Sequence, residues 1–86
     1  DYVIYYSPDN GATWRHIQDD ELAVVGEKPT DTSYILADAG TGPDVFAWNT
    51  PRSGFPDGSY VLRIEAYRRD MALHYSVHQM KIYIER

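Results

Sequence analysis

The stretch from Pro56 to Tyr67 constrains the fold most, because it joins a tight turn to a strictly alternating strand. Pro56, Asp57 and Gly58 predict the turn, since proline presets φ and glycine accepts a positive φ. Alternate side chains of the following strand point to opposite faces. One face would carry Tyr60, Leu62, Ile64 and Ala66, and the other Val61, Arg63, Glu65 and Tyr67. We expect the second face to meet water, as is typical of an antiparallel sheet.

Similar patterns predict further strands, each bounded by turn residues. The strand at residues 1–6 has apolar or aromatic side chains on both faces, so we expect it to be central in its sheet. The other predicted strands cover residues 14–17, 32–37, 45–49 and roughly 74–85, while residues 22–25 form either a brief strand or a loop anchor. No segment shows a convincing helical period. The pattern therefore predicts an all-β chain whose six or seven antiparallel strands form a β-sandwich.

Composition narrows the classes of function. The chain has 86 residues, which suits one small domain, and its 14% aromatic content compensates for a thin core. Cysteine is absent, which excludes disulfides and cysteine-based metal sites. The net charge of -5 and the scattered basic residues argue against nucleic-acid binding. Since the sequence has no apolar run of 18 residues, we also expect no membrane insertion.

Residues 7–14 carry a recognisable turn pattern. Ser7, Asp9, Gly11, Thr13 and Trp14 fit S-x-D-x-G-x-T-W, which resembles the Asp-box hairpin of sialidase-like propellers and other secreted β proteins. The resemblance implies a structural role, in which the aspartate ties the turn backbone and the tryptophan packs against its own hairpin. A single copy does not predict a propeller. Calcium binding by Asp9 and its neighbour Asn10 is an alternative, and an Asx-turn is the interpretation that we favour.

The second half of the chain is similar to bacterial fibronectin type III and immunoglobulin-like domains. The resemblance rests on the run from Phe46, Trp48 and Asn49 through the Pro56–Tyr67 stretch to Tyr75. It implies that Tyr60 forms a tyrosine corner with the preceding backbone and that Leu62 lies in the core. It covers residues 45–86 well and residues 1–17 moderately. The first strands of such a domain have no counterpart before Asp1, so we expect residues 1–86 to be a single domain excised from a larger protein.

Candidate chemistry is sparse. His16, His74 and His78 could bind zinc if the fold brought them together, but they lack a recognised ligand spacing. The acidic residues 19–21 are more typical of a solvated turn than of a calcium loop. No serine lies in a nucleophile motif, and two facing carboxylates are hard to place in a thin domain. We therefore predict no catalytic residues, no cofactor and no metal, although the chain could belong to a larger enzyme.

Aromatic side chains are the best candidates for binding. We expect Tyr5, Tyr67 and Tyr83 to face outward, with Trp14 or Trp48 at a rim, where exposed rings can stack on sugars or contact neighbouring domains. The other interpretation, which we favour, is that most of these rings cover a small core. The remaining candidates are structural: Asp9, Gly11, Trp14, Trp48, Gly58, Tyr60 and Leu62. Charged residues of the same outer face, Arg63, Glu65, Arg68 and Arg69, are expected to form ordinary cross-strand pairs.

These observations favour a non-catalytic accessory module of a secreted, cell-surface or periplasmic multidomain protein. Its partners would be adjacent domains of the same protein or another protein. Two other functions stay open: a carbohydrate-binding module that uses exposed aromatics, and a domain that supports the active site of a neighbouring hydrolase.

Overall fold

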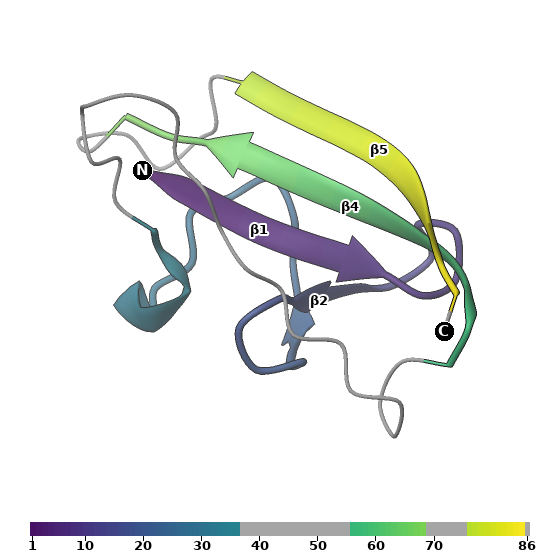
Figure 1. Ribbon diagram of the computed structural model, residues 1–86. Coiled ribbons are helices and arrows are strands. Elements are labelled where there is room, and N and C mark those ends of the chain that lie inside the picture. The colour runs from purple at the N-terminus through teal and green to yellow at the C-terminus, as the bar shows by residue number, and fades with distance from the viewer. Residues whose placement is uncertain (37–55, 69–75, 86) are drawn as a thin grey trace.

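The computed structural model describes residues 1–36, 56–68 and 76–85 (Figure 1). The strands are β1 (Tyr2–Ser7), β2 (Trp14–His16), β3 (Leu22–Ala23), β4 (Gly58–Ala66) and β5 (Ser76–Ile84), and a short 3-10 helix η1 covers Thr32–Tyr34. The strands form one antiparallel sheet in the order β3-β2-β1-β4-β5. The all-β, antiparallel prediction is confirmed at this level. The described residues make an open sheet, and they do not include the second layer of a sandwich.

Two long pairings build most of this sheet. β1 pairs with β4 from Tyr2 opposite Ala66 to Ser7 opposite Val61. β4 then pairs with β5 along its whole length, from Gly58 opposite Ile84 to Ala66 opposite Ser76. β1 also pairs with β2 on its other edge, so the first strand is central, as its two apolar faces predicted.

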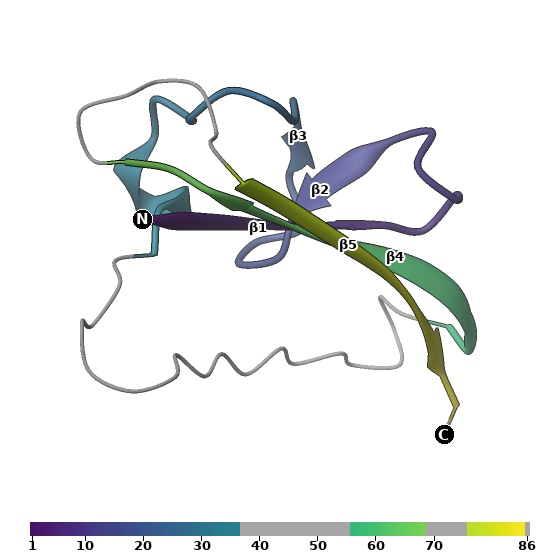
Figure 2. The same cartoon turned by 90° about the horizontal axis from the view of Figure 1, so that it is seen from above.

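One face of the sheet is covered by the chain itself. Val3 and Tyr5 of β1 form a core cluster with Tyr67, and Val25 and Ile35 pack against it. Figure 2 shows the segment that contains β3 and η1 on one side of β1. We call this side of the sheet, which carries Val3, Tyr5, Glu65 and Tyr67, the covered face.

The opposite side is mostly hydrophobic, and we call it the apolar face. Tyr6 and Tyr60 form a buried cluster on it, and Leu62, Ile82 and Ile84 pack against them. Tyr60 also donates its hydroxyl hydrogen bond to the carbonyl oxygen of Pro56 at 2.7 Å. The hydrogen bond expected for a tyrosine corner is therefore present.

The prediction of a strand over residues 32–37 is wrong for its first half. Residues 32–34 form η1 because Asp31 caps them, with its carboxylate accepting hydrogen bonds from the backbone N–H and the hydroxyl of Ser33 at 2.9 and 2.7 Å. Leu36 then makes a single antiparallel bridge with Tyr2. The cap at Asp31 thus favours a helical turn over the extended conformation for these residues.

The other predicted strands either match the structure or lie outside the described residues. The pattern at residues 22–25 indicates either a brief strand or a loop anchor, and β3 covers only Leu22–Ala23. The predicted strand at residues 45–49, including Trp48, lies outside the described residues. The start of the last predicted strand, at residues 74–75, does as well.

Removing the Tyr60 hydroxyl tests the corner. We expect Tyr60→Phe to lower the free energy of unfolding by about 1 kcal/mol, because the Pro56 carbonyl loses its donor while the ring stays in place. Urea denaturation measures the change. Tyr83→Phe is the matched control, since Tyr83 is 66% exposed and should leave the midpoint unchanged. Equal midpoints for Tyr60→Phe and the wild type would contradict the role of this hydrogen bond.

Candidate functional site

The β1–β2 hairpin is held by its own side chains. The backbone N–H and hydroxyl of Thr13 donate to the two Asp9 carboxylate oxygens at 2.8 and 2.6 Å. The Ser7 hydroxyl donates to Asp9 at 2.8 Å and accepts from the Gly11 N–H at 2.7 Å. Asn10 and Gly11 have φ values of 60° and 95°, which asparagine and glycine tolerate best. The aspartate therefore ties the turn, as the sequence pattern predicted.

This hydrogen bonding sets the charge of Asp9. The Thr13 hydroxyl, then the Thr13 backbone N–H and the Ser7 hydroxyl, lower the pKa of Asp9 to about 2. The carboxylate is thus ionised at neutral pH, and both of its oxygens are engaged inside the hairpin. Among the described residues, no group of three or more histidine, cysteine, aspartate or glutamate residues is arranged to hold a metal ion.

Trp14 lines a shallow hollow beside the hairpin. A Cβ added at Gly11 would lie 3.7 Å from Cζ2 of the Trp14 ring, so the ring lies beside the turn. The hollow has a volume of about 210 Å³, and its walls come from the hairpin, β4 and β5. Its lining includes Asn10, Trp14, Val61, Gln79 and Lys81.

The hollow combines an aromatic ring with polar side chains. Gln79 accepts a hydrogen bond from Nη1 of Arg63 at 2.9 Å, which leaves its amide NH2 group available. The side chains of Asn10 and Lys81 form no hydrogen bond or ion pair with the part of the chain that the structure describes. A half-buried indole beside amide and ammonium donors can bind a polar ring by stacking and hydrogen bonding.

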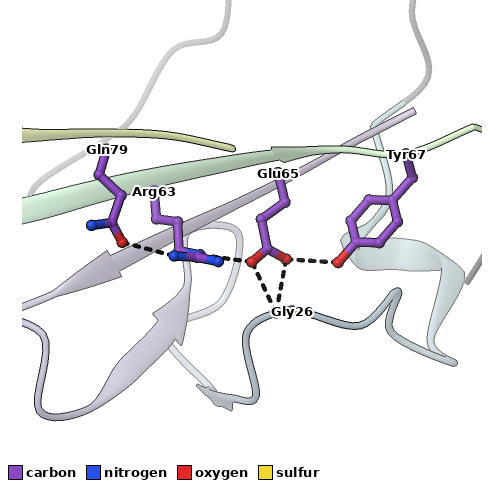
Figure 3. A network of polar contacts seen from close by, with 5 residues as sticks. All are labelled: Gly26, Arg63, Glu65, Tyr67 and Gln79. Carbon is purple, nitrogen blue, oxygen red and sulfur yellow. Dashed lines mark hydrogen bonds and ion pairs between the residues drawn. The ribbon is translucent and has the colours of Figure 1, made fainter. Parts of the chain in front are cut away.

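A fully buried carboxylate organises the covered face (Figure 3). Glu65 has 0% exposure, and its oxygens accept from Nε of Arg63 at 2.6 Å and from the Tyr67 hydroxyl at 2.6 Å. The backbone N–H of Gly26 donates to the same carboxylate at 2.8 Å. Arg63 continues the chain of contacts to Gln79 at the edge of the hollow. The network therefore joins β4 and β5 to the segment that contains β3, Gly26 and η1, which we call the covering segment.

Protonation of this carboxylate is disfavoured despite its burial. Burial alone would raise the pKa of Glu65, but hydrogen bonds from Tyr67, Arg63 and Gly26 together outweigh it and hold the pKa below its usual value. Conversely, burial and then the neighbouring Glu65 carboxylate raise the pKa of the Tyr67 hydroxyl. The carboxylate is therefore a buried anion that accepts hydrogen bonds from three donors.

The outward placement that we expected for Tyr5 and Tyr67 is wrong. They are 0% and 1% exposed, and their core cluster is covered by Trp14, Ala23, Val25 and Ile35. The prediction that Arg63 and Glu65 belong to an exposed charged face is also wrong. Glu65 is buried, and Arg63 forms an ion pair with it. The apolar side chains on both faces of β1 could have indicated this burial. Val3 and Tyr5 must be shielded from water, and they lie opposite Glu65 and Arg63 on the same face.

The three histidines do not assemble. His16 lies on the covered face, opposite Tyr5, whereas His78 lies opposite Ile64 on the apolar face. His74 is outside the described residues. His16 instead stacks on Tyr34 with ring centroids 3.7 Å apart, and its Nδ1 is buried without a hydrogen bond. Burial lowers the pKa of His16, partly offset by Asp19 and Asp31.

The other candidates divide between core and surface. Leu62 packs on the apolar face as predicted, and Gly58 begins β4. Tyr83 is exposed, as predicted, on β5. None of the helices in the described part is long and apolar enough to cross a membrane. No protein-family model matches the sequence, and no curated protein or solved structure is significantly similar to the chain.

Replacing the buried carboxylate tests the network. We expect Glu65→Gln to lower the free energy of unfolding at pH 7 by about 2–3 kcal/mol, because Arg63 loses its counter-ion in a buried site. The exposed change Glu85→Gln is the control. Chemical denaturation of both variants measures the difference, and equal stabilities would contradict a structural role for the carboxylate.

The same variant changes the pH dependence of stability. The folded-state pKa of Glu65 is depressed, so its contribution is present above the unfolded pKa of about 4.5 and is lost as the pH falls through the folded pKa. Wild-type stability should therefore fall more steeply than that of Glu65→Gln below about pH 4.5.

Proposed function

We propose that the chain is a non-catalytic accessory module of a secreted or cell-surface multidomain protein, and that it acts by contacting a neighbouring domain or another protein. The observation that carries the proposal is the exposure of β5. Val77, Met80 and Tyr83 are 36%, 41% and 66% exposed on this one strand. Exposed hydrophobic side chains gathered on one element favour a protein contact.

We also propose an immunoglobulin-like or fibronectin type III-like sandwich as the complete fold. The order β2-β1-β4-β5 is the order of the C′, C, F and G strands in the variable-type immunoglobulin sheet. The Tyr60 hydrogen bond to Pro56 is of the kind that a tyrosine corner makes. In such a sandwich, a second sheet would cover the apolar face.

The described groups support a binding role better than a catalytic one. Glu65 is enclosed and hydrogen-bonded, and Asp9 is engaged by its own turn. Within the described ranges, the hollow beside Trp14 holds no acid–base pair, since its polar residues are Asn10, Gln79 and Lys81. A general acid and base must both reach one reacting atom, which this lining does not allow.

Hydrogen–deuterium exchange tests the contact role. We expect the β5 amides at positions 76–84 to exchange at least tenfold more slowly in the longer parent protein than in the dilute 86-residue chain. The β2–β3 turn, residues 17–20, is the internal control and should exchange alike in both. Equal exchange of β5 in the two samples would contradict the proposal.

Carbohydrate binding is the second candidate, favoured by the hollow that Trp14 forms with Asn10, Gln79 and Lys81. An indole face stacks on a sugar ring, while the amide and ammonium groups donate to its oxygens. The ammonium of Lys81 would favour an acidic sugar.

A titration of the chain with neutral and acidic oligosaccharides tests this candidate. We expect saturable binding that Lys81→Met weakens at least tenfold for the acidic sugars. Arg68→Met removes an exposed cation elsewhere and should bind as the wild type does. Absence of saturable binding, or equal loss in both variants, would exclude this hollow as the sugar site.

A further inference from the structure

The β5 strand forms a long, open edge of the sheet. It pairs with β4 on one side, and no other strand in the described part of the chain pairs with it (Figure 1). The opposite edge, β3, has only two residues, whereas β5 has nine. An edge strand carries unpaired N–H and C=O groups along its length, which another strand can pair with. Proteins usually protect such edges with proline, charges or a bulge. In β5, Lys81 is the one charged residue, and proline is absent.

We propose that β5 pairs antiparallel with β5 of a second copy of this chain, about a two-fold axis that passes through Met80. The proposal rests on the proposed contact function and names its partner. A two-fold axis perpendicular to the sheet keeps each face on its own side, so two five-stranded sheets join into one continuous sheet.

The side chains of β5 are self-complementary in this register. Met80 is the central residue of Ser76–Ile84, so an axis at Met80 pairs the strand over its full length. Each exposed hydrophobic residue then faces another one: Met80 lies opposite its own copy on the apolar face, and Val77 lies opposite Tyr83 on the covered face. Directly opposed side chains have Cβ atoms about 4.5–5.5 Å apart, so these pairs are in contact.

Charge also favours this register. With the axis at Met80, the ammonium of Lys81 lies opposite the amide of Gln79. A shift of the axis to Lys81 would place two ammonium groups directly opposite each other, which is destabilising. The net charge of -5 lies mainly elsewhere, since residues 76–85 hold one lysine and one glutamate. A second copy therefore meets β5 without like-charge contact.

Cysteine scanning tests the axis directly, because the chain has no cysteine of its own. Met80→Cys should form a disulfide-linked dimer under mild oxidation, since the two sulfur-bearing positions face each other. Val77→Cys is the matched control, because it is similarly exposed and its two copies would lie about 20 Å apart along the paired strands. We expect at least tenfold faster cross-linking for Met80→Cys, and equal rates would overturn the register.

A charge exchange gives a second test that does not depend on oxidation. Met80→Lys and Met80→Glu should each weaken dimerisation of the 86-residue chain at least tenfold, because like charges then meet on the axis. An equimolar mixture of the two variants should dimerise again. Sedimentation equilibrium measures each sample, with the wild type expected to dimerise as its concentration rises.

The outcomes separate the two proposals. A wild type that stays monomeric at every concentration, or a mixture that fails to dimerise, overturns self-pairing. The contact function fails only if β5 also exchanges its amides equally fast in the longer parent protein.

Discussion

A buried carboxylate is the constraint on which the described structure depends. Glu65 has no access to water, so its charge must be balanced inside the protein. Arg63 and Tyr67 come from the same strand region, but Gly26 is 39 residues away in the chain. The covering segment must therefore be in place before the carboxylate is satisfied. This requirement couples the sheet to the segment that lies over it.

The same network reaches the two surfaces that bear on function. Arg63 holds Gln79 at the hollow beside Trp14, on the side of the sheet nearest β5. The core of the covered face lies over β1, and Val77 and Tyr83 on the same face of β5 remain exposed. Among the described residues, the sheet is therefore packed against a core in its middle, while its β5 edge has no strand beside it. Binding surfaces often lie on such less supported elements.

Local patterns predicted β1, β2, β4 and β5, because the causes of these strands are local. The alternation after Pro56 and the turn chemistry around Asp9 depend on neighbouring residues, and both appear in the structure as expected. The outward placement of the covered face is wrong, because its burial depends on Val25 and Ile35, which are far from β4 in the sequence and whose packing against this face no local pattern predicts. The burial of this face could be predicted only by considering β1 and β4 together. Because β1 has apolar side chains on both faces, its neighbours Arg63 and Glu65 on β4 must also be shielded from water. Similarly, Asp31 acted through a cap rather than through strand propensity.

The contacts of Glu65 also bear on how this sequence can change during evolution. The carboxylate, the guanidinium and the phenol satisfy one another, so a substitution at one of these positions alters the effect of substitutions at the other two. Loss of the acid alone leaves a half-buried guanidinium without its counter-ion, and loss of the arginine alone leaves a buried anion. Positions 63, 65 and 67 should therefore drift as a linked group among homologous sequences, while the exposed positions of the strand vary independently.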